Sequence, residues 1–583
     1  MASTPTPAPE PPIPIPPDRD LTAIARRLGR SPGSAPTAPS LTAEPGSQRT
    51  FHIAVLPPGA VGGDALPSMR EATATLLAVS EHGLFYWELG LEPPQPSAEQ
   101  AARLFEEVVR PAVTPVFGEQ RAGGEGRIVV LHADLGGGAG GYFSDADEAP
   151  AWVYPYSNEA SMVYLDASIS PESPAYAPLL AHEYQHLVQF AADPSEDSWV
   201  NEGLSEVAAQ LAGPYGGRRS AFLDDPRLQL NEWSGDDLDY GKSHLWFDYL
   251  MQRFGGTDII AAVASEPEDG VAGVRAVLAR YGATFEDVVV DWAVANLLDA
   301  PSGPYAYLEG DVSVTPLATL TPGERLDREV PQFAADYIAI RSAGPVTVTF
   351  GGEAEAPVLP AVISRGQGVW WSNRGDAIDT ALTREFDLSS VATATLTFRT
   401  WFDIERGWDY GYVEASADGG RTWRILRGLH STDLNPVGNA FGPGYTGTSG
   451  GGPEPAWVEE RIDLSPFAGQ SVLVRFEYVT DGGFHHDGWA IGDVRVPEIG
   501  FADPARTDQG WRAEGFARLD RPLAQRFALR LAQGGLVRPI EVDASGRARF
   551  DVDGTSDPVT LIVVPLTDGT AVAARYTLSA ALH

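Results

Sequence analysis

Apolar residues in the first half of the chain recur at helical spacing, and the clearest stripe lies before residue 192. Its members follow one another at three- and four-residue intervals: Leu180, Tyr184, Leu187, Val188 and Ala191. This spacing predicts an amphipathic helix with one buried face. Ser173 followed by Pro174 is typical of a helix start, and Asp193-Pro194 is typical of a helix stop.

Further elements are predicted around this helix. Strands are expected at 51–55, 128–131 and 161–166, and helices at 72–84, 97–117 and 199–211. The glycine-rich run 136–142 and the segment 152–156 lie where an edge strand would pair with extended substrate, although a plain loop explains the glycine run equally well. After about Pro304, short alternating strands separated by Gly, Asp and Pro turns predict an all-β region.

These patterns divide the chain into five parts. We expect a flexible Pro-rich leader at 1–47 with a short helix near 21–28, an N-terminal segment at 48–95, an α+β part at 96–304, a discontinuous β-sandwich at 305–365 and 500–583, and a β domain at 366–499 inserted into that sandwich. The segment 48–95 is either a propeptide remnant or an N-terminal elaboration of the α+β part.

The run from His182 to His186 lies inside the first predicted helix and has the pattern H-E-x-x-H. His182 and His186 are one turn apart on one face, where two imidazoles can bind one zinc ion. Glu183, beside the first histidine, can take a proton from a metal-bound water. The alternative is a polar surface helix that matches the pattern by coincidence.

A second helical pattern, from Trp199 to Gly213, argues against a coincidental match to H-E-x-x-H. Catalytic zinc sites use three protein ligands and leave a position for water, whereas structural sites use four. Glu202 is the natural third ligand if the second helix packs across the first. Glu206, one turn later, is placed to accept the spare N–H of a ligating histidine and fix its tautomer.

A third segment begins at Tyr240. Amide hydrolysis creates an oxyanion, which a neutral donor beside the metal stabilises. Tyr240 can supply a phenol for this purpose, and His244 is the second candidate. The alternative is that Tyr240 only opens an ordinary amphipathic helix that runs to Phe254. Lys242, in the same segment, is the only lysine in the chain.

Composition narrows the function classes. The 583-residue chain has 41 basic and 79 acidic residues, and its formal charge of −38 argues against nucleic acid or an anionic membrane as a partner. The absence of cysteine excludes disulfides and cysteine-ligated zinc. No apolar run approaches the length of a membrane span. The N-terminus is not a signal peptide, but a Pro-rich leader commonly follows a removed signal or lipid anchor. We therefore expect a secreted or cell-surface protein whose export signal is absent from this sequence.

The three segments resemble those of zinc metallopeptidases whose third ligand is a glutamate, the gluzincins. The N-E-G-L-x-E run at 201–206 and the Y-x-K segment at 240–242 are similar to the aminopeptidase branch, whereas the short gap between His186 and Glu202 resembles secreted bacterial endopeptidases of the hyicolysin and immune inhibitor A type. The glycine-methionine-glutamate-asparagine motif by which aminopeptidases hold a substrate N-terminus is not visible upstream. The resemblance therefore implies an endopeptidase acting on protein or peptide substrates.

By the same resemblance, His182, His186 and Glu202 bind zinc, Glu183 is the general base and Tyr240 stabilises the transition state. The block from Trp370 to Val494 resembles the jelly-roll module of immune inhibitor A-type proteases, which is similar to domains that bind carbohydrate or mediate adhesion. The expected fold is an α+β zincin (gluzincin) catalytic domain followed by all-β jelly-roll and β-sandwich domains, with glycan or cell-surface contact through the jelly roll.

Acidic side chains gather at the ends and in the middle of this block: Asp376, Asp379, Asp403, Glu405, Asp409 and Asp493. Oxygen ligands that converge where the first and last strands meet would suit calcium, with Asp376 and Asp493 as the candidate ligands. Solvated turn carboxylates explain the same residues equally well. The run 485–487, His-His-Asp, is expected to be a solvated turn rather than a metal site.

Two functions of different classes follow. The first is a secreted zinc endopeptidase. The second is an adhesion or glycan-binding protein whose protease-like half is inert. The presence of Glu183 together with all three candidate ligands favours the first, because an inert scaffold needs no general base.

Overall fold

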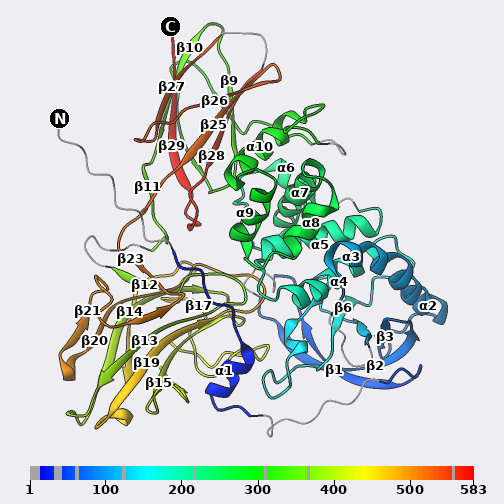
Figure 1. Cartoon of the computed structure of the whole chain (residues 1–583), viewed down its shortest axis with the longest axis vertical. Coiled ribbons are helices and arrows are strands. Elements are labelled where there is room, and N and C mark those ends of the chain that lie inside the picture. Colours follow the sequence, from blue (N-terminus) through cyan, green and yellow to red (C-terminus); the bar gives the residue numbers. More distant parts are fainter. Residues whose placement is uncertain are drawn as a thin grey trace.

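The computed structural model describes residues 13–31, 42–59, 65–120, 126–215, 217–307, 312–361, 363, 368–553 and 558–583. An α+β half comes first along the chain and is followed by two β-sandwiches (Figure 1). Multiple β-sheets in the C-terminal half confirm the expected multidomain, β-rich architecture. Within the described residues, no helix has the length and apolar character that a membrane span requires.

One mixed sheet forms the base of the α+β half. Its strands, in order across the sheet, are β1 (Gln48–Val55), β2 (Ser68–Val79), β3 (Gly83–Glu88), β4 (Ile128–Ala133), β6 (Met162–Asp166) and β5 (Gly141–Phe143). The central strand β4 is buried on both faces, since Val130 points to the helices while Val129 and Leu131 point to the opposite side. β5 runs antiparallel to β6 at one edge. The sheet continues across the boundary expected at residue 95, because β1 to β3 pair with the later strands.

The helix predicted at 72–84 is wrong. Ala72, Ala74, Leu76 and Ala78 are buried at every second position of β2, which pairs with β1 on one side and β3 on the other. The residue types favour a helix, but pairing on both sides and burial of one face outweigh that local preference.

The face of the sheet that carries Val130 is covered by α2 (Gln95–Leu104) and α4 (Tyr176–Ala192). The π-helical turn η2 (Phe105–Val109) and α3 (Arg110–Phe117) continue from α2 and pack against α4. A second layer of helices packs beyond them: α5 (Ser198–Ala212), α6 (Arg219–Asp224), α7 (Asp237–Arg253), α8 (Thr257–Ala264), α9 (Gly270–Arg280) and α10 (Phe285–Leu298). The helices predicted at 97–117, around 182–186 and at 199–211 are confirmed.

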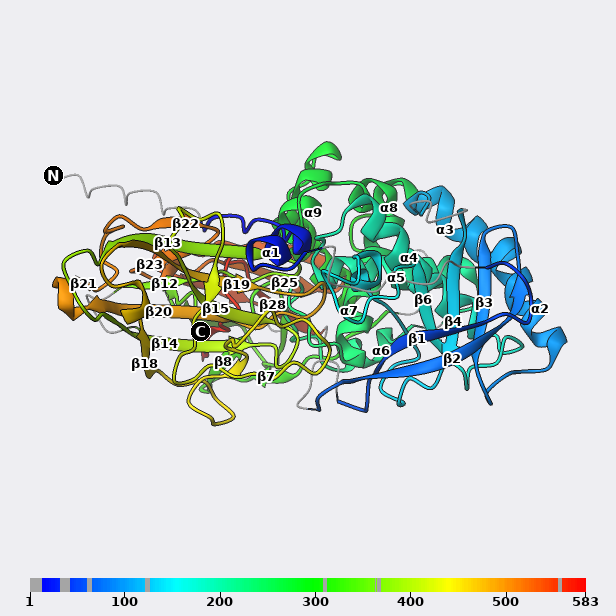
Figure 2. The ribbon, with the colours of Figure 1, turned by 90° about the horizontal axis from the view of Figure 1, so that it is seen from below.

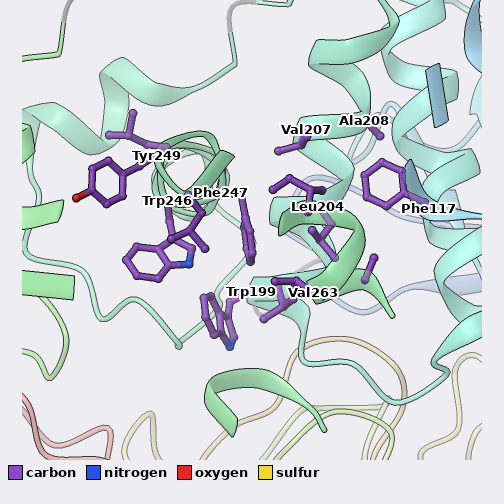
Figure 3. Close-up of a cluster of buried hydrophobic side chains, with 14 of the residues drawn as sticks. Phe117, Trp199, Leu204, Val207, Ala208, Trp246, Phe247, Tyr249 and Val263 are labelled. Carbon is purple, nitrogen blue, oxygen red and sulfur yellow. The ribbon is translucent and has the colours of Figure 1, made fainter. Parts of the chain in front are cut away.

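The core between α5 and α7 is packed closely. Trp199, Leu204 and Val207 from α5 meet Trp246 and Phe247 from α7 (Figure 3). A Cβ added at Gly203 would lie 2.3 Å from Cδ2 of Phe247, so glycine is required at that crossing. This contact fixes the position of α5 one residue after Glu202.

The terminal sandwich is built from two separated stretches of chain. The first stretch supplies β7 (Ala318–Leu320), β8 (Arg325–Val330), β9 (Asp336–Ile340) and β10 (Val346–Gly352), and the second supplies β25 (Phe527–Gln533), β26 (Leu536–Ile540), β27 (Arg547–Val552), β28 (Val559–Pro565) and β29 (Ala574–Leu582). β10 pairs with β27 and β29, and β9 pairs with β28. β11 (Glu355–Ala356) and β24 (Leu523–Ala524) pair with each other at the passage to the insert.

The inserted sandwich consists of a seven-stranded and a five-stranded sheet around one apolar core. Its strands are β12 (Val369–Trp371), β13 (Asp379–Asp387), β14 (Thr395–Ile404), β15 (Tyr410–Ser416), β16 (Arg424–Ile425), β17 (Gly447–Thr448), β18 (Val458–Asp463), β19 (Ser471–Val479), β20 (Gly488–Val496), β21 (Phe501–Asp503), β22 (Arg512–Glu514) and β23 (Ala517–Leu519). It lies beside the α+β half and below the terminal sandwich in Figure 1.

The short helix predicted near 21–28 is confirmed as α1 (Leu21–Arg27), but the described part of the leader is docked rather than flexible. α1 lies where the inserted sandwich meets the α+β half (Figures 1 and 2). Arg27 Nη2 lies 2.6 Å from Glu477 Oε1, and Arg19 forms an ion pair with Asp145 of the α+β half. Proline-rich composition did not reveal these partners, which are distant in sequence. Residues 1–12 and 32–41 of the leader lie outside the described residues.

Candidate metal centre

A cavity of about 1230 Å³ lies between the α+β half and the inserted sandwich. The α+β half contributes residues of β5, α4, α5 and α7 to its walls. The inserted sandwich contributes Glu405, Trp408, Val437 and the loop 481–484. His182, Glu183, His186, Glu202, Glu206 and Tyr240 all line this one cavity. The sequence patterns had not indicated that the inserted sandwich would form part of the wall.

The helices α4 and α5 bring the three predicted ligands together. The ring centres of His182 and His186 are 4.8 Å apart. Glu202 Oε2 lies 3.1 Å from Nε2 of His182 and 3.6 Å from Nε2 of His186. The candidate ligand atoms of the three residues all lie within 4.8 Å of one another. Two helices that cross at this point therefore present one carboxylate and two imidazoles to a common point.

Outer partners orient both imidazoles. Nδ1 of His182 lies 3.5 Å from Oε1 of Glu206, and Nδ1 of His186 lies 3.1 Å from Oδ1 of Asn201. Glu206 is held in turn by the Tyr215 hydroxyl, which donates to its carboxylate at 2.7 Å. Such partners fix which ring nitrogen faces a metal. Asn201 and Tyr215 had not been singled out, although Asn201 directly precedes Glu202 in the sequence.

This donor set fits a zinc ion. Two neutral imidazoles and one carboxylate are a ligand combination that catalytic zinc sites use, with a fourth position left open. Oε2 of Glu202 is buried, and the ring nitrogens of His182 and His186 are its neighbours at 3.1 and 3.6 Å. A buried carboxylate oxygen beside two imidazole nitrogens forms a group that one cation can bind through all three atoms.

Glu183 lies between the candidate ligands and the edge strand β5. A Cβ added at Gly141 would lie 2.7 Å from Oε1 of Glu183 and 2.7 Å from the carbonyl oxygen of Tyr164. Only glycine therefore lets the edge strand approach the carboxylate this closely. Burial raises the pKa of Glu183, although the charges of His182 and His186 lower it in part. Residues 136–140 of the glycine-rich run form a loop and Gly141 begins the edge strand β5, so both alternatives hold for part of the run, whereas the segment 152–156 forms turns.

Tyr240 and His244 lie one turn apart on α7, but only Tyr240 lines the cavity. Tyr240 lines the cavity and its ring centre is 6.1 Å from that of His182. Burial, followed by the charge of Glu202, raises the pKa of Tyr240 well above its usual range, so the phenol keeps its proton. His244 is fully buried behind Glu206 and lies 2.7 Å from Oε1 of Gln210. Of these two candidates, Tyr240 is the one at the cavity wall.

Lys242 has a structural role. Its buried ammonium group donates to the carbonyl oxygens of Gln229 and Glu232 and pairs with Asp239. These contacts hold the chain that leads into α7, and Lys242 does not belong to the cavity wall.

The structure separates the two residues that were expected to bind calcium. Asp376 accepts a hydrogen bond from the backbone N–H of Ser198 at 2.6 Å and lies 2.9 Å from Nδ1 of His485. Asp493 pairs with Arg399 at 3.1 Å. Other acidic residues of the block also have basic partners: Asp379 with Arg27, Asp403 with His486, and Asp487 with Arg374.

Three other carboxylates converge instead. Candidate ligand atoms of Glu405, Asp409 and Asp481 lie within 4.8 Å of one another, and we call these residues the carboxylate cluster. Oε2 of Glu405 and Oδ2 of Asp409 are buried without a hydrogen-bond partner among the described residues. Burial and the charges of its neighbours Asp481 and Asp409 raise the pKa of Glu405 well above its usual range. Burial also raises the pKa of Asp481 to about 7.

The class of the inserted sandwich follows from a family comparison. Residues 343–521 match the family model described as "Immune inhibitor A-like, MAM domain". This stretch includes β10, β11 and all the strands of the inserted sandwich. The chain therefore carries an immune inhibitor A-like MAM domain, in agreement with the resemblance noted for the block from Trp370 to Val494.

Several curated proteins are similar to part of the chain. Pre-pro-metalloprotease PrtV of Vibrio cholerae serotype O1 is 30% identical over 158 residues, which is 27% of this chain and 16% of PrtV. Immune inhibitor A of Bacillus thuringiensis subsp. alesti is 28% identical over 155 residues, 26% of this chain and 21% of the relative. Bacillopeptidase F of Bacillus subtilis (strain 168) is 29% identical over 99 residues, 17% of this chain and 5% of the relative.

The chain thus spans about a fifth or less of the length of the curated relatives it matches. Two of these relatives are named as a metalloprotease and a peptidase. The comparisons therefore support a protease-related protein, and a metalloprotease relative implies a metal cofactor.

Proposed function

We propose that this protein is a secreted or cell-surface zinc-dependent endopeptidase of the gluzincin type. The observation that carries the proposal is the convergence of His182, His186 and Glu202 at the wall of a large cavity, with Glu183 and Tyr240 on the same wall. The cavity is open to an edge strand, β5, and its size suits an extended peptide rather than a free amino acid.

Each side chain has a defined task in this proposal. His182, His186 and Glu202 hold zinc, which when bound polarises water and the substrate carbonyl. Glu183 accepts the proton of the attacking water and passes it to the leaving amine, and burial favours this exchange by raising the pKa of the carboxyl. The protonated phenol of Tyr240 donates to the oxyanion. The free edge of β5 pairs with the substrate backbone and aligns the scissile bond beside Glu183.

The main alternative is a glycan-binding or adhesion protein with an inert protease-like half. The MAM-domain match is compatible with it. Two features argue for the enzyme: Glu183 lies next to the candidate ligands, and Gly141 leaves space for its carboxylate. An inert scaffold would need neither the base nor the outer partners Glu206 and Asn201 of the histidines.

The test of the proposed function is Glu183→Gln in the full chain. The variant should bind one zinc ion and keep the wild-type melting temperature, because glutamine has the same shape as glutamate. Casein hydrolysis should fall by about two to four orders of magnitude, the usual contribution of a positioned general base. Glu99→Gln, at an exposed position of α2, is the matched control. Wild-type turnover in Glu183→Gln, or activity of the wild type that survives chelation, would rule out the proposal.

We also propose that calcium binds the carboxylate cluster rather than Asp376 and Asp493. Hard oxygen ligands suit calcium, and two of the carboxylate oxygens at the cluster are buried with no hydrogen-bond partner among the residues that the structure describes. Glu405 and Asp481 line the same cavity as the proposed zinc ligands. Calcium at this place would stabilise the wall that the inserted sandwich contributes.

A further inference from the structure

We propose that Asp376, a residue of the inserted sandwich, is a positioning residue for the zinc ligand Glu202 on α5. This inference rests on the proposed function, because it concerns the same metal centre. It assigns the inserted sandwich a part in forming the site, in place of a role confined to adhesion or substrate capture.

The backbone at the start of α5 needs an external partner. The first N–H groups of a helix have no acceptor within the helix. Asp197 occupies the N-cap position of α5, but its side chain makes no capping hydrogen bond. The N–H of Ser198 donates instead to Oδ2 of Asp376, at 2.6 Å and across 178 positions of sequence. A carboxylate from another domain thus caps the helix that carries Glu202.

A second hydrogen bond holds the same residue. The backbone N–H of Phe484, in the loop that lines the cavity, donates to the hydroxyl oxygen of Ser198 at 3.2 Å. The inserted sandwich therefore holds Ser198 through both its main chain and its side chain. Ser198 is itself buried, so water does not replace either bond readily.

The capping carboxylate is held firmly in place. Asp376 is buried, and its other oxygen lies 2.9 Å from Nδ1 of His485. A negative charge at this end of α5 also interacts favourably with the helix dipole. Asp376 is therefore fixed by its own domain and presents an oriented acceptor to α5.

The position of this contact explains why it bears on the metal. Ser198 lies one helical turn before Glu202, and Gly203 is fixed against Phe247 directly after Glu202. The ligand thus lies between two anchor points, one in the α+β core and one in the inserted sandwich. Metal sites require their ligands to be held within about 0.5 Å of the productive geometry. Loss of the first anchor lets the first turn of α5 fray and displaces Glu202 from the two histidines.

The experiment compares two substitutions at Ser198 in the full chain. Ser198→Ala removes the hydroxyl and keeps the N–H, whereas Ser198→Pro removes both. Proline is suited to the first helical position, and Asp197 has φ −56° and ψ 138°, which are compatible with a following proline. The difference between the two variants therefore isolates the bond to Asp376 without a change in the charge of the inserted sandwich.

Zinc affinity, measured by competition with a chromogenic chelator, is the main readout. We expect Ser198→Pro and Asp376→Ala to weaken zinc binding by about 10–100-fold, the usual effect of removing a group that orients a ligand. Ser198→Ala should weaken it less than about threefold. Asp376→Asn, which keeps an acceptor oxygen for the N–H, should recover most of the loss. In peptide hydrolysis, kcat should fall more than KM rises, since the metal acts mainly in the transition state.

Asp493→Ala is the control, because Asp493 belongs to the same sandwich and pairs with Arg399 away from α5. If Ser198→Pro and Asp376→Ala bind zinc as tightly as the wild type and only their melting temperatures fall, Asp376 has a merely structural role and the inference is overturned. If the wild type itself binds no zinc, the proposed function fails, and that outcome is recognised before any variant is compared.

Discussion

The two groups of candidate metal ligands differ in chemistry and surroundings. Ligand atoms lie within 4.8 Å of one another both in the histidine centre (His182, His186 and Glu202) and in the carboxylate cluster. The histidine centre offers two nitrogens and one oxygen, and both imidazoles have outer partners. The carboxylate cluster offers only oxygens, and two of them have no hydrogen-bond donor in the part of the chain that the structure describes. The first arrangement suits zinc and the second suits a hard cation such as calcium.

The difference shows how each group is stabilised without a metal. In the histidine centre, a carboxylate lies beside two imidazoles, with Oε2 of Glu202 within 3.6 Å of Nε2 of both rings. In the carboxylate cluster, like charges meet in a buried place, and the pKa values of Glu405 and Asp409 are raised well above their usual range by burial first and by neighbouring carboxylates second. We therefore expect that removal of one ligand weakens metal binding at the histidine centre. Removal of one carboxylate from the calcium-free cluster should instead stabilise the protein, because fewer like charges then repel one another.

The largest effect is expected from the zinc ligand itself. Glu202→Ala should weaken zinc binding more than 100-fold, because it removes a direct ligand. Glu206→Ala should weaken zinc binding by about 10–100-fold, because Glu206 only orients His182. Metal content after dialysis and chelator competition measure both. A reversed order would move the ligand to Glu206 and change the register of α5 in the histidine centre.

A smaller effect is expected at the oxyanion donor. Tyr240→Phe should lose roughly 3 kcal/mol of transition-state stabilisation, about a hundredfold in kcat, with zinc content unchanged. Steady-state kinetics on a quenched-fluorescence peptide measure this loss. His244→Asn is the comparison, since His244 is buried behind Glu206 and lies outside the cavity wall. A greater loss of turnover in His244→Asn than in Tyr240→Phe would show that the phenol is not the donor.

The smallest effect is expected at the carboxylate cluster, where a substitution should raise stability in the absence of calcium. Calcium at a hundredfold excess over its Kd should raise the free energy of unfolding of the wild type by about 2.7 kcal/mol. Each kcal/mol corresponds to a rise in melting temperature of roughly 2–4 °C. Asp409→Asn should melt higher than the wild type in calcium-free buffer, because one buried like charge is gone, and should lose the calcium response.

Asp493→Asn is the matched control for calcium. Asp493 has φ +52°, a conformation that asparagine tolerates well, and its carboxylate pairs with Arg399 outside the cluster. It should keep the calcium response in differential scanning calorimetry. A lost response in Asp493→Asn together with a normal response in Asp409→Asn would return the calcium site to the position expected from sequence.

The candidate metal centre could be predicted largely from local sequence because both helices carry their own signal. The spacing of His182 and His186 within an apolar stripe fixes which face they share, and α5 follows after a short connection. The failures arose where the deciding contact is distant in sequence. β2 is a strand because it pairs with β1 and β3 on its two sides. Asp376 binds the N-terminus of α5, which lies 178 positions earlier in the sequence.

The same reasoning explains why the cavity wall of the inserted sandwich and the role of Lys242 were missed. The positions of Glu405 and Asp481 beside the histidine centre depend on how the inserted sandwich packs on the α+β half, and no periodic pattern records that packing. The role of Lys242 was equally hidden, since its partners Gln229 and Glu232 present backbone carbonyls, whose availability does not depend on residue type.

The docked leader also sets an order for events during synthesis. Arg27 lies before the α+β half in the chain, but its partner Glu477 follows 450 positions later. At about 5–20 residues per second, a ribosome needs on the order of a minute to supply that partner. Arg27 therefore lacks this partner while the α+β half folds, and the contact between α1 and the inserted sandwich forms only after β19 has emerged. A nascent chain that stops before β19 lacks this closure.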